Sequence, residues 1–192
     1  MKTAAQLRKY KKSLIIGFLW GFAESLFFFL VPDIVIGFIA LFSYSQGLAA
    51  LAGSIIGGVC GGAFLYLLIH LLLGPESLHL LTFVPAITPL MVVNAGTSVH
   101  HWGLLSLFYA PFSGIPYKVY VAQLSLQGYS PFLVLFLTIP SRITRFALVY
   151  CASAGTGLIL KNNIQKYKIY WGILYFSFWT IYMIHYWSNL PR

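Results

Sequence analysis

Residues 22–33 read FAESLFFFLVPD, an apolar run that contains a glutamate and ends on a proline followed by an aspartate. The run belongs to a longer apolar segment, residues 13–42, whose only charged residues are Glu24 and Asp33. As one helix this segment would be about 45 Å long, more than the ~30 Å hydrocarbon core of a bilayer requires. Because Pro32 interrupts it, the sequence predicts a broken or re-entrant hairpin, a structure that needs protein or a wet cavity around it.

The composition predicts the environment of this hairpin. Of the 192 residues, 59% are hydrophobic and 8% are charged, whereas a soluble domain carries about 25% charged residues. Twelve basic and three acidic side chains cannot cover a globule of this size. We therefore expect an all-α integral membrane protein with several transmembrane helices and Pro-interrupted hairpins.

The clearest spanning helix is predicted at Gln46–Leu73. Small residues recur in it at a four-residue spacing, which lets a second helix approach closely in lipid. We assign these residues to helix packing and not to phosphate binding, because no strand precedes them. They are Ala49, Gly53, Gly57 and Gly61, with Gly58 and Gly62 beside them.

Proline divides the rest of the apolar sequence. Gly74–His101 is predicted to be a connection with a turn at residues 94–97. Trp102–Gln127 is a second interrupted segment, and Phe132–Leu160 is apolar apart from two arginines. Ile169–Trp187 is predicted to be a final spanning helix, because Tyr-Trp pairs mark both of its ends.

The net charge of +9 comes mostly from two clusters beside apolar segments. The positive-inside rule explains them better than a nucleic-acid partner. We therefore expect a cytoplasmic basic tail (1–12), a membrane core (13–160), a cytoplasmic basic loop (161–168) and a C-terminal transmembrane helix (169–187). Residues 13–30 superficially resemble a signal peptide, but Glu24 and the lack of a cleavage site predict a retained segment. The clusters contain Lys2, Arg8, Lys9, Lys11 and Lys12, then Lys161, Lys166 and Lys168.

Five charged residues of the core stand in apolar context: Glu24, Asp33, Lys118, Arg142 and Arg145. Each charge at a helix centre costs roughly 2.5–3.5 kcal/mol, so such residues line a cavity, pair or reach the interface. A break at Pro32 could turn both carboxylates toward one cavity. The two arginines are three residues apart and share a helix face, where they could grip a phosphate bidentately.

The alternative to a binding site is a set of internal salt bridges whose only role is to hold the helices together. The five charged residues together carry one net positive charge, which slightly favours an anionic ligand. The His100-His101 pair is predicted to lie in a loop, where an interfacial role is favoured over a metal site. Cys60 and Cys151 are predicted to be free, packed thiols. We expect no metal and no cofactor.

Four stretches in order resemble the DedA family, also described as the SNARE-associated Golgi protein or VTT domain. They are the acidic hairpin at 22–33, the glycine-rich helix at 53–62, GIPYKVY at 114–120 and SRITRF at 141–146. The resemblance covers residues 14–160. This chain has fewer prolines in the first hairpin than many members, and so resembles a divergent branch.

The resemblance implies two re-entrant hairpins that face each other inside the bilayer. Bacterial members are implicated in moving lipid carriers such as undecaprenyl phosphate, often with proton-motive-force dependence, and eukaryotic relatives scramble phospholipids. By motif position it implies functional roles for Glu24, Asp33, Arg142 and Arg145. We expect Lys118 and the arginines to bind a lipid phosphate, and the carboxylates to exchange protons. The expected location is a bacterial inner membrane with a cytoplasmic N-terminus.

The sequence is compatible with functions other than a proton-coupled flippase. A passive phospholipid scramblase and a scaffold without transport activity both remain open, as does the oligomeric state. A membrane phosphatase is disfavoured, because the Ser141-Arg142 signature of lipid phosphatases requires later His and Asp residues, where this chain has Leu148 and Ala152. We therefore expect no enzyme.

Overall fold

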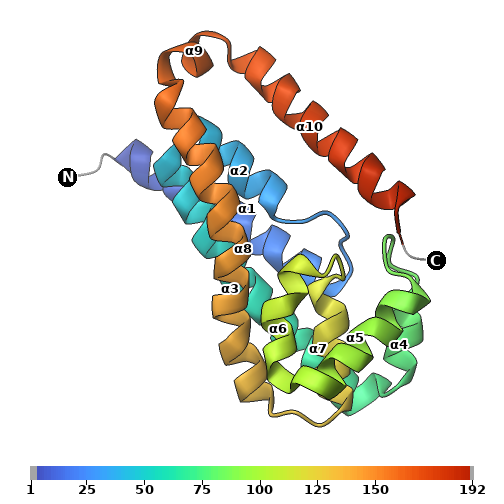
Figure 1. Cartoon of the computed structure of the whole chain (residues 1–192). Helices are drawn as coiled ribbons and strands as arrows, with labels where there is room; N and C mark the ends of the chain where they lie inside the picture. The colour runs from blue at the N-terminus through green and yellow to red at the C-terminus, as the bar shows by residue number, and fades with distance from the viewer. Residues whose placement is uncertain (1–3, 191–192) are drawn as a thin grey trace.

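The computed structural model describes residues 4–190, and this part of the chain is helical without any strand (Figure 1). Three of the helices exceed 22 residues, and the shorter ones cluster in the middle of the sequence. The elements are α1 (Ala4–Leu26), α2 (Asp33–Phe42), α3 (Tyr44–Leu68), η1 (Ile69–Leu73), α4 (Glu76–Leu81), α5 (Pro89–Trp102), η2 (Gly103–Leu105), α6 (Ser106–Tyr109), η3 (Ala110–Phe112), α7 (Tyr117–Leu126), α8 (Pro131–Ile159), α9 (Lys161–Lys166) and α10 (Lys168–Ser188).

The predicted break near Pro32 is present as a helical hairpin. α1 ends at Leu26, residues 27–32 form the turn, and α2 begins at Asp33 and runs back (Figure 1). Trp20 Nε1 donates a hydrogen bond of 3.0 Å to the Leu30 carbonyl and so fixes the turn against α1. α2 then packs against both α3 and α8. The turn is therefore anchored at both of its ends, although Phe27 is exposed.

Glycines bring α1 and α3 into backbone contact along most of their length. A Cβ atom at Gly53 or Gly57 would overlap the carbonyl oxygen of Leu14 or Phe18 respectively. From the other side, a Cβ at Gly21 would overlap the Ser54 carbonyl. The order of these pairs makes the helices parallel. The predicted small-residue stripe thus lies against α1, with Gly61 facing the Phe22 carbonyl one turn further on.

A second hairpin comes from the opposite end of the molecule. η2, α6 and η3 run toward the centre, residues 113–116 turn, and α7 runs back (Figure 1). Near the open end of this hairpin, Gly103 lies beside the Tyr129 ring. At its turn, Lys118 Nζ donates a 2.8 Å hydrogen bond to the Phe28 carbonyl of the first hairpin. The turns of the two hairpins therefore meet.

Several local predictions were wrong. Residues 94–97 do not turn but lie within α5, because the helix begins at Pro89 behind a Thr88 cap and the Thr97 hydroxyl donates back to the Val93 carbonyl of the same helix. His100 and His101 consequently belong to the last turn of α5 and not to a loop. The basic segment predicted as a loop contains a short helix, α9. Cys60 and Cys151 are free thiols, but both are exposed.

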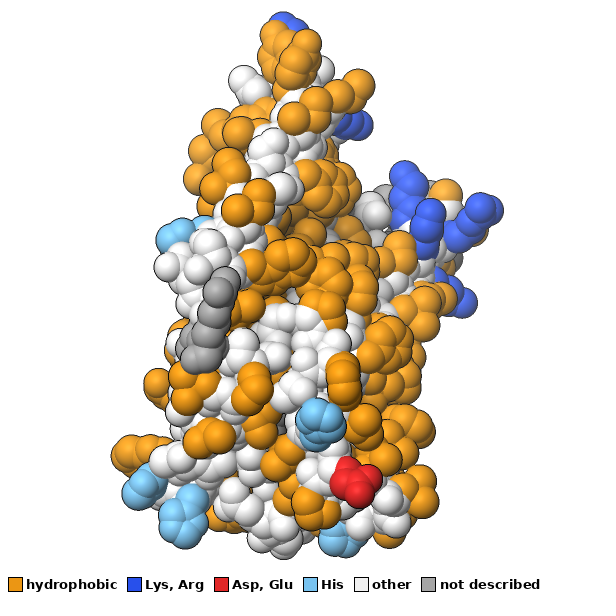
Figure 2. Space-filling view, turned by 90° about the vertical axis from the view of Figure 1, so that its right-hand side faces the viewer, with side chains coloured by type: hydrophobic (Ala, Val, Ile, Leu, Met, Phe, Trp, Pro, Cys, Tyr) orange, Lys and Arg blue, Asp and Glu red, His pale blue; other side chains and the backbone are white. Residues whose placement is uncertain are grey.

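Two helices of the described chain are long and apolar enough to cross a bilayer: Tyr44–Leu73, which joins α3 and η1, and Pro131–Ile159, which is α8. α10, which corresponds to the predicted final spanning helix, is not among these two. Large hydrophobic side chains are exposed over most elements, and they cover much of the face in Figure 2. This surface weakly supports a membrane location.

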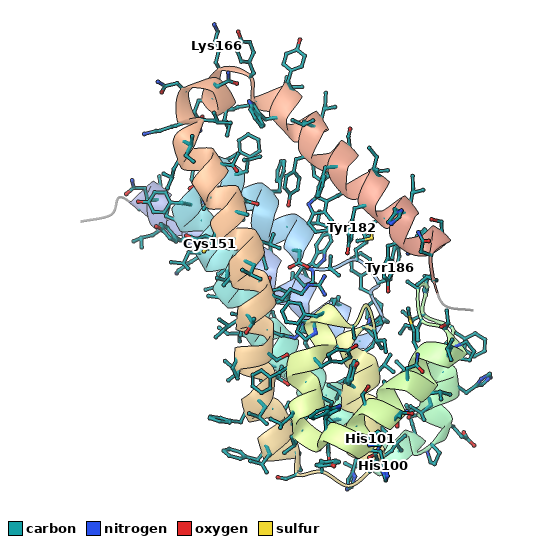
Figure 3. All side chains as sticks on the ribbon, in the orientation of Figure 1. His100, His101, Cys151, Lys166, Tyr182 and Tyr186 are labelled. Carbon is teal, nitrogen blue, oxygen red and sulfur yellow. The ribbon has the colours of Figure 1, made fainter. Side chains whose placement is uncertain are left out.

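The charged surface is divided between the two ends of the molecule. In Figure 2, Lys and Arg side chains gather toward one end, and the acidic side chain and most histidines lie toward the other. Figure 3 shows the same division, with Lys166 at one end and His100 and His101 at the other. Lys2 and Arg192 lie outside the described residues. The predicted clustering of positive charge thus becomes a basic end of the fold.

Candidate functional site

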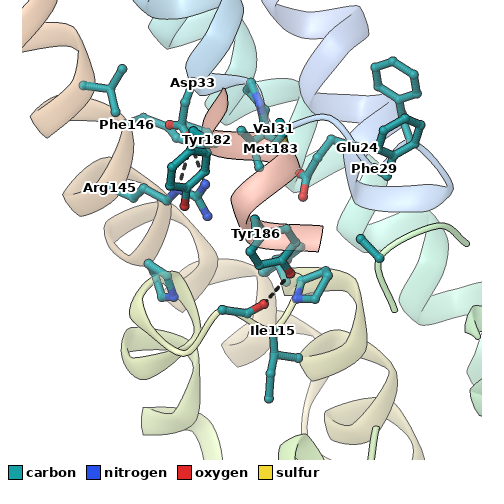
Figure 4. A pocket seen from close by; sticks show the side chains of 18 of the residues that line it. Glu24, Phe29, Val31, Asp33, Ile115, Arg145, Phe146, Tyr182, Met183 and Tyr186 are labelled. Atoms are coloured by element: carbon teal, nitrogen blue, oxygen red, sulfur yellow. Dashed lines mark hydrogen bonds and ion pairs between the residues drawn. The ribbon is translucent and has the colours of Figure 1, made fainter. Parts of the chain in front are cut away.

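A cavity of about 580 Å³ opens where the turns of the two hairpins meet. α8 forms one wall of this cavity and α10 forms another. All five charged residues that the sequence singled out line it: Glu24, Asp33, Lys118, Arg142 and Arg145. Four separate elements thus bring together side chains that are up to 121 positions apart in the sequence. We call this space the central cavity (Figure 4).

The two arginines do not grip a common partner. Arg142 Nη2 lies 2.9 Å from Glu24 Oε2, and Arg145 Nη2 lies 2.6 Å from Asp33 Oδ2. α8 continues as a helix through Pro140, so the arginines sit about one turn apart on it. The structure therefore separates the predicted clamp into two ion pairs, because each carboxylate of the first hairpin faces a different arginine.

The Arg142–Glu24 pair is the more enclosed of the two. The side chains are 6% and 9% exposed respectively. Arg142 also donates from Nη2 to Ser25 Oγ at 2.9 Å, and its guanidinium carbon stands 4.1 Å from the centre of the Tyr117 ring. Its shaft lies against Gly58, where a Cβ would crowd Nε. Stacking, ion pairing and hydrogen bonding together hold this side chain in one place.

The Arg145–Asp33 pair is more open. Asp33 is buried, but the side chain of Arg145 is 35% exposed. Both contacts of Arg145, from Nε at 2.8 Å and from Nη2, go to Asp33 Oδ2. Asp33 Oδ1 is buried and has no hydrogen-bond partner among the described residues. One carboxylate oxygen and part of one guanidinium are therefore left for a further ligand or for water.

Lys118 is the third cation of the cavity and differs from the arginines. It is 1% exposed, and its ammonium group donates to the Phe28 carbonyl. Within residues 4–190 it forms no ion pair. Coulomb attraction to an incoming anion is strong in such a poorly solvated position. Lys118 is therefore the cation whose charge is least compensated.

Aromatic residues of α10 complete the central cavity, and none of them was predicted as a site residue from the sequence. Tyr175, Trp179, Tyr182 and Tyr186 line the wall and follow the spacing i, i+4, i+7 and i+11 of one helix face. Figures 3 and 4 show Tyr182 and Tyr186 directed inward from α10, Tyr182 toward Arg145. This spacing is visible in the sequence and could have indicated a shared helix face, whereas the Tyr-Trp pairs at the helix ends predicted only interfacial anchors.

The central cavity lies far from both ends of α8, the helix that carries Arg142 and Arg145. Arg142 is eleven residues after Pro131, and Arg145 is fourteen before Ile159. At 1.5 Å per residue these separations are about 17 Å and about 21 Å along α8. If α8 crosses a bilayer, its arginines stand close to the midplane. This depth is where a charged side chain is most costly and most often functional.

No metal centre is supported elsewhere in residues 4–190, where no group of three or more His, Cys, Asp or Glu side chains could hold an ion. His100 and His101 lie near each other in α5, with ring centroids 5.8 Å apart, but no acidic or cysteine ligand joins them. Comparisons of the chain with protein-family models, with curated proteins and with solved structures give no match.

Proposed function

We propose that this protein is an integral membrane transporter or flippase for an anionic, phosphate-bearing lipid such as a polyprenyl phosphate or a phospholipid. One observation carries the proposal: two acidic and three basic side chains line a single cavity halfway along an apolar, membrane-length helix. The two hairpins would be re-entrant, with their turns at the bilayer midplane. Membership of the DedA family, as a divergent branch, is part of the proposal.

Ion-pair exchange provides a mechanism. A lipid phosphate carries anionic oxygen acceptors like those of the Glu24 and Asp33 carboxylates, and it can replace them on the arginines. Protonation of a carboxylate weakens its hold on the guanidinium, so that arrival of a proton and arrival of a phosphate favour each other. Lys118 supplies a third positive charge, and no carboxylate of the described residues lies within ion-pair distance of it. The acyl or prenyl chains would stay in the bilayer.

A scaffold without transport activity is the second candidate, and the same ion pairs favour it. Arg142 and Arg145 are each paired with a carboxylate of the protein itself. Buried pairs of this kind can specify how helices pack without binding anything else. A passive scramblase would use the same cavity but no proton. No enzymatic reaction, cofactor or nucleic-acid partner is proposed.

Paired measurements on arginine variants distinguish transporter from scaffold. We expect Arg142→Lys and Arg145→Lys to abolish lipid movement while the protein stays folded, because lysine keeps the charge but loses the planar fork. The probe is fluorescent phosphatidylglycerol in phosphatidylcholine vesicles, with headgroup accessibility as readout and thermal unfolding as its companion. Arg8→Lys, at an exposed position of α1, is the matched control. Lipid movement that survives in both cavity variants would defeat the phosphate-clamp mechanism.

A pH gradient tests the proposed role of the carboxylates. If Glu24 and Asp33 carry protons, an imposed gradient should accelerate lipid movement in the wild-type protein. Glu24→Gln and Asp33→Asn should remove that dependence, because neither amide exchanges a proton under these conditions. The measurement compares vesicles with and without the gradient for each variant. Movement that ignores the gradient in the wild-type protein would identify a passive scramblase.

The proposed location is the inner membrane of a bacterium, with both basic clusters on the cytoplasmic side. The Lys and Arg side chains of the described residues gather toward one end of the fold in Figure 2, as the positive-inside rule would require if that end is cytoplasmic. α10 then leads the C-terminus to the opposite side. Reporter fusions at the two termini should give opposite signals, and equal signals would contradict this orientation.

A further inference from the structure

α10 stands apart from the rest of the bundle. None of its residues is buried, although it is 21 residues long. Figure 1 shows it extending away from α8 on its own, joined to the bundle at one end through α9. Its inner face lines the central cavity, and its outer face carries exposed hydrophobic residues such as Ile173 and Ile181. α10 is thus a side wall of the cavity and not a core helix.

Two tyrosines attach this wall, one to each hairpin. The Tyr175 hydroxyl donates to backbone carbonyls at the start of α2, at 3.0 Å to Ile34 and 3.3 Å to Asp33. The Tyr186 hydroxyl donates to the Gly114 carbonyl in the turn of the second hairpin, at 2.7 Å (Figure 4). Ring contacts add to these bonds, among them Phe29 with Trp187.

These attachments suit a wall that opens. Once the phenols leave, the carbonyls of Asp33, Ile34 and Gly114 can accept hydrogen bonds from water, and the freed hydroxyls can donate to water or to a phosphate oxygen. The cavity behind α10 holds the least compensated cation, Lys118, and the partly exposed Arg145. An anionic headgroup entering from the side would meet Tyr182 and Arg145 first.

We infer that α10 is a lateral gate, with Tyr175 and Tyr186 as its latches, through which a phosphate-bearing lipid reaches the central cavity from the bilayer. The inference rests on the proposed function for the identity of what enters, but the movement of α10 can be tested by itself. The headgroup would pass between α10 and α8, and the hydrocarbon chains would remain outside among the exposed apolar side chains of α10.

Accessibility of the cavity tests the gate without any transport assay. Ser153 on α8 lines the cavity, so a Ser153→Cys variant, with Cys60 and Cys151 replaced by alanine, reports on it through labelling by N-ethylmaleimide in phosphatidylcholine vesicles. We expect the double change Tyr175→Phe and Tyr186→Phe to raise the labelling rate about tenfold, since the two hydroxyls and their three hydrogen bonds are lost. The thermal unfolding of the bundle should stay the same, because α10 contributes no buried residue.

Tyr170→Phe is the matched control. Tyr170 lies on the same helix and is exposed, and its hydroxyl forms no hydrogen bond with the described residues. Its labelling rate should equal that of the unaltered reporter protein. Equal rates in the double variant and in this control would overturn the gate. A large loss of thermal stability in the double variant would overturn it too, since α10 would then be a structural element.

A reversible cross-link separates failure of the gate from failure of the proposed function. Cysteines replacing Phe29 and Trp187, joined by a bis-methanethiosulfonate reagent, should stop movement of fluorescent phosphatidylglycerol until a reductant is added. A cross-link between Phe22 and Phe64, on the packed helices α1 and α3, should leave it unchanged. Movement that continues through the locked wall would overturn the gate. If no protein moves the lipid, the proposed function fails and the labelling rates alone decide the gate.

Discussion

The two sides of this molecule are held together by different means. Along α1 and α3, glycines place backbone against backbone, and a Cβ atom at Gly57 would overlap the Phe18 carbonyl. Around the central cavity, long polar side chains bridge elements that otherwise stand apart, as in the Arg145–Asp33 pair. Close packing leaves no room for movement or for a ligand. A bridging side chain can exchange its partner, so the cavity is the side on which function is expected.

The largest expected effect is on the packed side. Gly57→Leu places a branched side chain where a Cβ already meets the Phe18 backbone. Because the backbone of α1 must move, the cost should exceed the ~1–3 kcal/mol of ordinary core overpacking. We expect loss of folded, inserted protein, measured as yield and thermal unfolding in detergent.

Gly155→Leu provides the matched control for this change. Gly155 lies in α8, and a Cβ there meets no atom within 4 Å. The same substitution should therefore be tolerated with yield close to that of the wild-type protein. Normal yield of Gly57→Leu would mean that α1 and α3 do not depend on their close contact, and the contrast between the two sides would fail.

The next largest effect concerns the enclosed ion pair. Glu24→Gln leaves the Arg142 charge buried without a compensating partner, a loss of ~3–5 kcal/mol for a fully buried pair. Asp33→Asn should cost less, because the side chain of Arg145 is 35% exposed and water can reach it. The measurement is the thermal unfolding of both variants in the same detergent.

A double substitution checks that stranded charge is the cause. Combining Glu24→Gln with Arg142→Met removes both charges and should recover part of the stability that Glu24→Gln loses. No recovery would show that Arg142 stabilises the fold through its stacking on Tyr117, and a larger loss in Asp33→Asn would reverse the assigned order of the two pairs.

The sequence predicted which charged residues form the site, but it did not predict how they pair. Charge in apolar context is visible without a structure, and the five residues chosen on that ground all line the central cavity. The pairing was not predictable, because α8 meets the first hairpin 112 to 118 positions away along the chain. Three-residue spacing placed both arginines on one helix face, but it could not show that a separate carboxylate stands opposite each.

The fold was predicted where the local signal was strong. The break near Pro32 and the long helix through Gly57 both follow from residue type and spacing. The turn predicted at residues 94–97 was wrong because tertiary contacts overrode the weak local preference: Gly96 lies beside the Gln123 side chain, which also donates to the Val92 carbonyl. The position of α10 had no local signal apart from the spacing of its tyrosines.

The smallest expected effect on stability is that of a Lys118 substitution. It tests whether Lys118 is a structural residue, like the packed glycines, or a ligand-binding residue of the central cavity. Lys118→Met has similar volume and removes a buried cation that forms no ion pair among residues 4–190. Loss of that charge is favourable, whereas the Phe28 carbonyl loses its donor at a cost of ~1–3 kcal/mol. These two contributions oppose each other, so the free energy of unfolding should change by about 1 kcal/mol or less. Movement of fluorescent phosphatidylglycerol should nevertheless fall strongly, since the least compensated cation of the cavity is gone. Lys161→Met, at an exposed position, should affect neither measurement. A loss of several kcal/mol with transport intact would instead make Lys118 a structural tie between the two hairpin turns, and the phosphate would then depend on the arginines alone.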